Sequence, residues 1–494
     1  MRPRIPPSSL AAVCVAAGLL LAARPAAAQA GPPAAHEDAA FDFMNLLAHN
    51  GLHDIDDESW NAYGQFTYIS NWKLPFNALH TNLNGSMNSL LPTYERSFTG
   101  SFTLFFGVRL WQGGQFYFVP EVISEEALSN LRGIGGAIQN FELQKQGSAR
   151  PELYRSRTYL RQTFNFGGEA IRQTSDPMQL GTVVESRRLV LTAGNFSLLD
   201  VFDKNSVSWD PRQTFLNMAF MTYASWDFPA DARGYTYGAT AELYWDDWTL
   251  RVAHVMPPED PNAPSIDFRF WKFYGNALEI EHDHVIAGHP GAIRVLGYRN
   301  HVDTGSFNDA IAAFQANPVA NNAAVCEPTV PYNYGSTNST APDLVCVRKP
   351  NVKLGIGLDL EQYLTPDIGL FFRGMYSDGQ SEVDAFNSAD RSLAVGAVAK
   401  GGSWNRPFDV TGVGFGMSWI SAAHARYLAM GGVDGFVGDG FLQQGAEGIV
   451  EGFYSYNLVR AIWLSGDYQL LWNPGYNTAR GPVHIFGARV HVEF

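Results

Sequence analysis

Apolar and polar residues alternate along long stretches of the chain, most clearly over residues 97–111. An extended strand over these residues would place Phe98, Phe102, Phe106 and Leu110 on one face, and mainly Ser, Thr, Gly and Arg residues on the other. A period of two residues predicts a β-strand with one apolar face. The alternation is long enough for a tilted strand that crosses a bilayer, which needs about 9–11 residues.

Sixteen segments of this kind predict sixteen strands, although those from Ser186, Ala277 and Ala292 show the pattern less clearly. An even number of strands allows an antiparallel sheet to close on itself with both chain ends on one side. The expected fold class is therefore all-β, a transmembrane antiparallel β-barrel over residues 59–494. The sixteen segments begin near Asn61, Ser97, Gly114, Ser156, Ser186, Arg233, Trp248, Ala277, Ala292, Asn351, Ile368, Ser392, Asp409, Gly448, Trp463 and Pro482.

The stretches between the predicted strands mostly alternate between short and long, as in barrels with short periplasmic turns and long extracellular loops. The link between Phe166 and Ser186 fits less well, because about twenty residues is long for a turn. Either the flanking strands extend further or this turn carries additional structure. The short connections are Gln112-Gly113, Asp246-Asp247, 288–291, 365–367 and the junction at Arg460. The long connections are 73–96, 123–155, 197–232, 257–275, 302–350 and 421–447.

The N-terminus has the features of a secretory signal peptide. Arg2 and Arg4 precede an apolar stretch over residues 10–23, and small residues follow it. The apolar stretch is too short for a transmembrane helix. We expect residues 1–28 to be removed by cleavage after Ala28, with Ala30 as the second choice, and the chain to leave the cytoplasm.

Residues 29–58 form a predicted N-terminal periplasmic segment. Helix-forming residues at 41–48 predict a short helix near the mouth of the barrel, and an acidic stretch follows at 54–58. A disordered leader is an equally acceptable interpretation.

The last residues, 483–494, alternate again and end on Phe494. A final amphipathic strand that ends in Phe resembles the assembly signal of bacterial outer-membrane proteins. An edge strand of a soluble protein is the alternative, which the terminal Phe disfavours.

Composition supports an exported membrane barrel. Aromatic residues make up 13% of the chain and charged residues only 17%, a balance that suits a barrel with aromatic girdles. Loss of the three arginines in residues 1–28 leaves 31 basic residues against 48 acidic ones, a net charge of −17. Such a chain is a poor partner for nucleic acid. Beyond the signal peptide no uninterrupted apolar stretch reaches about 18 residues, so no membrane-spanning helix is predicted.

Cys326 and Cys346 remain after cleavage, and both lie in one polar stretch rich in Pro and Asn. In an oxidising compartment this pair predicts a disulfide that closes a loop. Two free thiols are the alternative.

Strand parity assigns a mixture of arginines, carboxylates and tyrosines to the inner face, since a charge that faces lipid is costly near the bilayer midplane. Guanidinium groups and carboxylates bind hydroxyl groups, and aromatic rings cover the apolar face of a sugar. A phosphate pore would instead need an excess of basic residues. A generic water-filled lumen of mixed charge is the alternative. The candidate lumen residues are Tyr117, Arg157, Tyr159, Arg161, Arg188, Glu242, Arg251, Asp359, Glu361 and Arg373.

The long, aromatic and polar stretch over residues 197–232 is the expected constriction, because it lies where the third outer loop should be. We expect it to fold into the barrel and to narrow the lumen. A loop that only covers the barrel mouth is the alternative. Its candidate residues are Asp200, Asp203, Lys204, Asn205 and Trp209.

Several stretches of the chain resemble the carbohydrate-selective porin family of Gram-negative bacteria, and the similarity covers nearly the whole mature chain. The resemblance implies a sixteen-stranded outer-membrane barrel, often trimeric, that passes glucose and related sugars by diffusion. The stretches are 100–111, 118–122, 135–141, 194–197, 203–205, 231–235 and the terminal stretch from Phe486.

Two further patterns carry less functional information. His282 and His284 share one strand face and could bind a metal, but their parity is opposite to that of the neighbouring acids and favours a membrane-interface or packing role. Gly412, Gly414 and Gly416 alternate along one strand and indicate close packing or a barrel bend. The sequence contains neither a nucleophile elbow nor a metalloprotease helix. We therefore expect no catalytic residue, no metal and no cofactor.

These patterns favour passive diffusion of hydrated sugars through an outer-membrane channel narrowed by the third loop. Lipids would surround the barrel, and the resemblance implies a homotrimer. A general or ion-selective diffusion porin is the first alternative, because the chain is acidic. An outer-membrane barrel hydrolase is the second, and it would need a Ser/His pair near one rim. A soluble periplasmic β-protein is the third.

Overall fold

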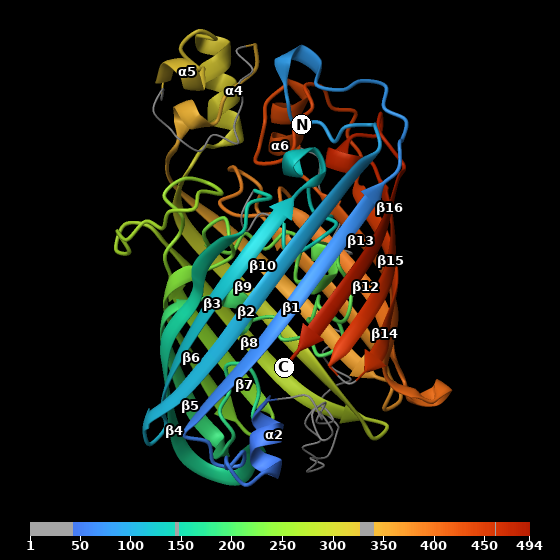
Figure 1. Cartoon of the computed structure of the whole chain (residues 1–494). Coiled ribbons are helices and arrows are strands. Elements are labelled where there is room, and N and C mark those ends of the chain that lie inside the picture. The colour runs from blue at the N-terminus through green and yellow to red at the C-terminus, as the bar shows by residue number, and fades with distance from the viewer. Residues whose placement is uncertain (1–42, 144–147, 327–339, 460) are drawn as a thin grey trace.

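The computed structural model describes residues 43–143, 148–326, 340–459 and 461–494, which form a closed antiparallel barrel of sixteen strands (Figure 1). Each strand pairs with its neighbours along the chain, and the last strand pairs with the first. The sixteen-stranded antiparallel barrel predicted from the sequence is confirmed. The strands are β1 (Trp60–Lys73), β2 (Glu95–Trp111), β3 (Gly114–Glu126), β4 (Glu152–Gln173), β5 (Thr182–Phe196), β6 (Thr236–Trp245), β7 (Trp248–Val255), β8 (Tyr274–Ile286), β9 (His289–Thr304), β10 (Lys349–Tyr363), β11 (Ile368–Ser377), β12 (Arg391–Gly401), β13 (Arg406–Trp419), β14 (Glu447–Val459), β15 (Ile462–Trp472) and β16 (Val483–Glu493).

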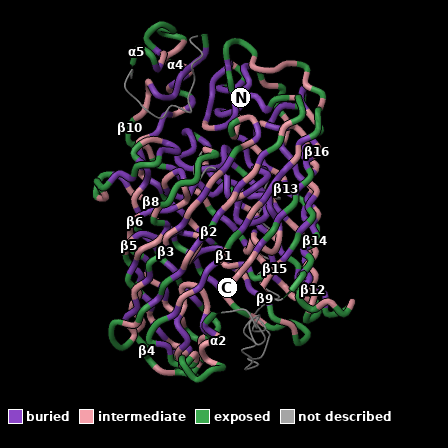
Figure 2. The backbone as a smooth tube through the Cα atoms, viewed as in Figure 1, coloured by how far each residue is buried: buried purple, intermediate pink, exposed green. Residues whose placement is uncertain are grey.

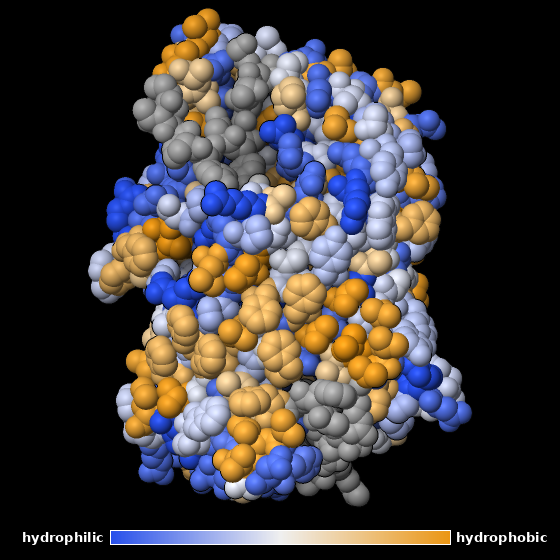
Figure 3. All heavy atoms as spheres, in the orientation of Figure 1, coloured by the Kyte–Doolittle hydropathy of each residue, from blue (hydrophilic) through white to orange (hydrophobic). Residues whose placement is uncertain are grey.

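The strands direct their apolar faces outward and their polar faces inward. In β2, Phe102 and Phe106 are exposed on the outer wall, whereas Ser101 and Thr103 are buried inside it. Buried residues fill the interior of the barrel (Figure 2), and apolar side chains form a band across the outer wall (Figure 3). This is the distribution that a barrel surrounded by lipid requires.

Short turns gather at one end of the barrel and long loops at the other, which we call the turn end and the loop end (Figure 1). β4 continues to Gln173 and β5 begins at Thr182, so longer strands account for most of the link that seemed too long for a turn. The expected junction at Arg460 lies outside the described residues, as do residues 1–42 with the cleavage sites after Ala28 and Ala30. None of the described helices is long and apolar enough to cross a membrane.

Short helices lie at both ends of the barrel and inside it. At the turn end, Met44 packs against Tyr63, Phe105 and Val119 on the inner wall. This contact brings the N-terminal segment into the lumen, where an extended leader would leave the wall uncovered. The helices are α2 (Phe43–His49), α3 (Met218–Met221), α4 (Phe307–Ala316), α5 (Ala323–Cys326) and α6 (Ala422–Ala429).

The loop end carries α4, α5 and α6 (Figure 1). Helices α4 and α6 pack through Phe307, Ala310 and Tyr427, which belong to one buried apolar cluster. A disulfide joins Cys326 to Cys346, the two cysteines paired by the sequence analysis. It therefore closes a loop beyond the strands and leaves the barrel wall without a covalent cross-link among the described residues.

Phe494 completes the seam between β1 and β16. Its N–H donates to the Gly64 carbonyl oxygen at 2.9 Å, and the Gly64 N–H donates to the Phe494 carbonyl oxygen at 2.7 Å. A Cβ atom on Gly64 would lie 2.3 Å from the Phe494 ring, which also stacks with the ring of Phe102 at 6.1 Å between centroids. Glycine at position 64 thus makes room for the terminal ring.

Deletion of Phe494 is expected to lower the yield of folded barrel, because it removes two seam hydrogen bonds, about 1 kcal/mol each, together with the ring contacts. The measurement is the fraction of refolded protein that resists unfolding by detergent in an unheated gel. Phe486→Ala is the matched control, since Phe486 is an exposed ring on the outer face of the same strand. Equal folded fractions for the deletion and the wild type would contradict the assigned role.

Candidate channel and its constriction

The connection between β5 and β6 lies inside the barrel, and we call residues 197–235 the inner loop. Carboxylates on the inner wall accept hydrogen bonds from its backbone. Glu279 accepts from the N–H of Asp203 at 2.9 Å, and Glu451 accepts from the N–H of Asn217 at 3.0 Å. The inward-facing acids of the strands therefore position the loop that narrows the barrel.

A buried set of three charged residues, which we call the latch, joins the inner loop to the wall. Nε of Arg373 on β11 lies 2.9 Å from Asp203 on the loop and 3.1 Å from Asp359 on β10. The Arg373 guanidinium also donates to the carbonyl oxygen of Phe220 at 2.7 Å. Asp359 has a second cationic partner, Arg294, at 2.8 Å. Each buried charge of the latch is thus matched by an opposite charge, the condition under which burial of ions is tolerated.

Glycines on the inner wall make room for the aromatic side chains of the inner loop. A Cβ atom on Gly414 would lie 2.8 Å from the Phe220 ring, and one on Gly357 would lie 2.9 Å from the Tyr223 ring. Of the two interpretations of the alternating glycines on β13, close packing is the one that these contacts support.

The second outer loop, residues 127–151, also turns into the barrel, although no sequence pattern was assigned that role. The Glu447 carboxylate on β14 accepts hydrogen bonds from the N–H groups of Gly135, Gly136 and Ala137 at 2.8–2.9 Å. The signal for this contact was present in the sequence as a run of small residues whose successive N–H groups can converge on one acceptor.

The second loop and the inner loop are joined by backbone hydrogen bonds. The N–H of Met218 donates to the carbonyl oxygen of Ile138 at 2.9 Å, and the N–H of Phe141 donates to that of Leu216 at 3.1 Å. The barrel is therefore narrowed by two loops that support each other.

A cavity of about 1150 Å³ remains inside the barrel beside these loops. Of the residues predicted from the sequence, nine line it: Arg157, Tyr159, Arg161, Arg188, Asp200, Lys204, Trp209, Glu242 and Arg251. Tyr117 lies beneath Arg161, whose guanidinium carbon is 5.2 Å from the centre of its ring.

The other five predicted residues lie behind the inner loop instead of along the cavity. They are Asp203, Asn205, Asp359, Glu361 and Arg373. The Asn205 side chain donates to Asp359 at 2.8 Å, and Glu361 accepts from the N–H of Ser206 at 2.5 Å. Strand parity places Asp359, Glu361 and Arg373 on the inner face, but the loop covers them.

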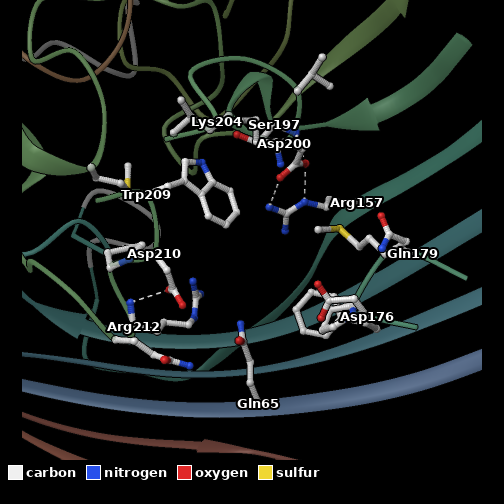
Figure 4. A pocket seen from close by; sticks show the side chains of 18 of the residues that line it. Gln65, Arg157, Asp176, Gln179, Ser197, Asp200, Lys204, Trp209, Asp210 and Arg212 are labelled. Atoms are coloured by element: carbon white, nitrogen blue, oxygen red, sulfur yellow. Dashed lines mark hydrogen bonds and ion pairs between the residues drawn. The ribbon is translucent and has the colours of Figure 1, made fainter. Parts of the chain in front are cut away.

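The narrow part of the cavity pairs Arg157 on the wall with Asp200 on the inner loop (Figure 4). Two nitrogens of Arg157 donate to the two carboxylate oxygens of Asp200 at 2.6 and 2.7 Å. Asp200 also accepts from the N–H of Ser197 at 3.0 Å. Burial alone would raise the pKa of Asp200, but the Arg157 guanidinium outweighs it and the pKa lies below its ordinary value. The pair therefore stays charged and holds this part of the loop against β4.

Aromatic rings carry most of the other cations at the cavity. The Lys204 ammonium lies 4.5 Å from the centre of the Trp209 ring, and the Arg188 guanidinium lies 3.8 Å from that of Tyr244. Arg161 lies 5.4 Å from the ring of Tyr159. Such contacts fix a cation over a ring face while its N–H groups stay free to donate into water. The cavity thus offers donors, acceptors and apolar ring faces, the groups that bind a sugar.

The histidine pair on β8 lies away from this cavity. His282 is exposed and stacks on the outer ring of Trp248 at 4.3 Å between centroids. His284 makes a 3.1 Å contact with the side chain of Gln362. Within the described residues no group of three His, Cys, Asp or Glu side chains is arranged to hold a metal ion.

Comparison with known proteins supports the geometry. The sequence matches the carbohydrate-selective porin, OprB family, over residues 91–494. The chain belongs to this family. No match was found among curated proteins.

Solved structures share the fold at low sequence identity. The high-pH structure of Pseudomonas putida OprB is 14% identical, with a TM-score of 0.61, and the match covers 88% of this chain and 94% of that one. The low-pH structure of the same protein is 11% identical with a TM-score of 0.44, covering 88% and 93%. The outer-membrane channel DcaP of Acinetobacter baumannii is 10% identical with a TM-score of 0.45, covering 88% and 97%.

Membership of the OprB family decides between the classes left open by the sequence. The protein is a β-barrel of the outer membrane, and it is a channel rather than an enzyme. The acidic and aromatic side chains of its interior are therefore best understood as the lining of a permeation path.

Proposed function

We propose that this OprB-family porin passes sugars of about the size of glucose by passive diffusion through the cavity beside the inner loop. The observation that supports it best is the combination of the Arg157–Asp200 pair with ring-supported cations around one opening. Hydroxyl groups of a sugar can accept from the cations and donate to the carboxylates, while its apolar face covers a ring. Such contacts are strong enough to concentrate the sugar and weak enough to release it. No cofactor or covalent step is required.

The nine cavity-lining residues are the proposed path of the substrate, and the latch residues are proposed to hold the constriction. The first experiment is liposome swelling with purified, refolded protein, comparing glucose, a disaccharide and an uncharged amino acid of similar size to glucose. Faster entry of glucose than of the amino acid supports a carbohydrate channel. Entry that follows size alone would reduce the function to general diffusion, and absence of swelling would remove the channel proposal.

Replacing Trp209 by Ala is expected to weaken block of the ion current by glucose about threefold to tenfold, because a ring contact of about 0.5–1.5 kcal/mol is lost. The measurement is the glucose concentration that halves the current of a single channel in a planar bilayer. Trp271→Ala is the matched control, since Trp271 is 83% exposed and does not line the cavity. An unchanged half-blocking concentration in the Trp209 variant would exclude the ring from the sugar path.

Three features of the mature protein are further proposals. Residues 1–28 are proposed to be a cleaved signal peptide, residues 29–58 an N-terminal segment on the periplasmic side, and the mature chain a homotrimer. N-terminal sequencing of the exported protein and its native mass in detergent test them. A start other than residue 29 or 31, or a purely monomeric mass, would count against the corresponding proposal.

A further inference from the structure

Three cations at the cavity form no ion pair with any carboxylate of the described residues. They are Arg161, Arg188 and Lys204, and all three line the cavity. Arg161 donates to the carbonyl oxygen of Met178 at 2.8 Å, and Arg188 donates to that of Glu185 at 2.9 Å. The Lys204 ammonium faces a tryptophan ring at 4.5 Å. Each cation therefore keeps N–H groups that no protein anion neutralises.

The carboxylates closest to these cations are already engaged. Asp200 accepts both hydrogen bonds from Arg157. Glu242 accepts from the hydroxyl group of Tyr244 at 2.8 Å and lies 3.5 Å from Arg251. Glu242 is also the one carboxylate that interacts electrostatically with all three of the cations named above. A single shared carboxylate thus stands against three cations, in addition to Arg251.

Glu121 is a further acid along the cavity, but its oxygens are occupied as well. It accepts from the hydroxyl group of Thr103 at 2.8 Å and from that of Tyr154. The excess of positive charge at the narrow part is therefore local, in a chain whose formal net charge is −14. Low-dielectric walls around a narrow opening focus such an excess on any solute inside it.

Tyrosine rings hold two of these cations in place. The guanidinium of Arg161 lies over Tyr117 and Tyr159, and that of Arg188 lies over Tyr244. A guanidinium fixed on a ring loses little further freedom when it binds a carboxylate. The site is therefore prepared for an anionic group before the solute arrives.

From this arrangement we infer that the constriction prefers sugars that carry a carboxylate, such as hexuronates, to neutral sugars of the same size. This inference rests on the proposed function and names the substrate class of the same site. The hydroxyl groups of such a sugar use the contacts proposed for glucose, and its carboxylate accepts charge-assisted hydrogen bonds from Arg161, Arg188 and Lys204. Weak, multiple contacts still allow release on the other side.

The test compares glucose, glucuronate and glucosamine, which share one ring size and differ in charge. Block of the single-channel current is titrated with each at mildly acidic pH, in about 0.1 M salt, where the Debye length is about 10 Å. We expect glucuronate to block at about tenfold lower concentration than glucose, and glucosamine to be the weakest. In about 1 M salt, where the Debye length falls to about 3 Å, the advantage of glucuronate should shrink while block by glucose stays constant.

Lys204→Met and Arg188→Met provide the matched variants, because methionine keeps most of the apolar stem and removes the charge. Each should bring the half-blocking concentration of glucuronate toward that of glucose and leave block by glucose within about twofold. Lys349→Met is the control, since Lys349 lies at the loop end, is exposed and pairs with Asp309. Lys204 belongs to a loop, so its variant keeps every strand residue if the β5 variant fails to fold.

The outcomes separate this inference from the proposed function. Equal block by glucuronate and glucose, or stronger block by glucosamine, would overturn the preference for anionic sugars while leaving the sugar channel intact. A preference for glucuronate that survives in both Met variants would also overturn it, because the charge would then act elsewhere. Absence of block and of swelling by any sugar would instead remove the proposed function itself.

Discussion

Replacing Arg373 by Met is expected to release the inner loop and to give a larger, noisier single-channel conductance with weaker block by sugar. Arg373 is 1% exposed and holds Asp203 on the loop and Asp359 on the wall. Removing one partner of a buried ion pair leaves an uncompensated charge, at a cost of about 3–5 kcal/mol. The loop can avoid that cost by moving Asp203 into water. Conductance and its fluctuations in planar bilayers measure this directly.

A second substitution separates loss of the latch from general damage to the barrel. Adding Asp203→Asn to the Arg373 variant removes the stranded charge, whereas Asp359 keeps Arg294 at 2.8 Å. The double variant should therefore recover part of the wild-type conductance. Arg391→Met is the control, because Arg391 is exposed and lies over the ring of Tyr376. A conductance equal to that of the wild type in the single Arg373 variant would show that the latch does not hold the loop.

Replacing Glu447 by Ala is expected to detach the second loop from the wall. Its carboxylate accepts from four backbone N–H groups, those of Gly135, Gly136, Ala137 and Gly475, and is 1% exposed. Each buried donor left without an acceptor costs about 1–3 kcal/mol, so the substitution should destabilise this contact by several kcal/mol. Trypsin cleavage after Arg132, which lies in the second loop, reports the detachment.

Cleavage after Arg132 should become at least about tenfold faster in the Glu447→Ala variant, the factor that corresponds to about 1.4 kcal/mol of local opening. Glu447→Gln keeps one acceptor oxygen and should give an intermediate rate. The folded fraction of the barrel serves as the internal control, since the sixteen strands keep their pairing. Identical cleavage rates in all three proteins would mean that Glu447 does not anchor the loop.

The sequence alone was sufficient for the barrel because the controlling interactions are local and periodic. Alternation every second residue distinguishes the lipid face from the inner face of β2 without knowledge of any other strand. The pairing of Cys326 with Cys346 followed from the absence of other cysteines in the mature chain. Longer strands at β4 and β5 resolved the link that seemed too long, because alternation weakens near strand ends and hides the last residues.

Tertiary structure decided which inward residues meet water. Arg157 and Arg373 have the same parity and the same side chain, yet one lines the cavity and the other holds the inner loop against the wall. The inward turn of the second loop depends on Glu447, which lies about three hundred residues further along the chain. The positive character of the constriction likewise appears only when each carboxylate is matched to its partner at hydrogen-bond distance. Composition counts all charges equally, whereas a neighbour a few ångströms away determines whether a charge is neutralised or left to act on a solute.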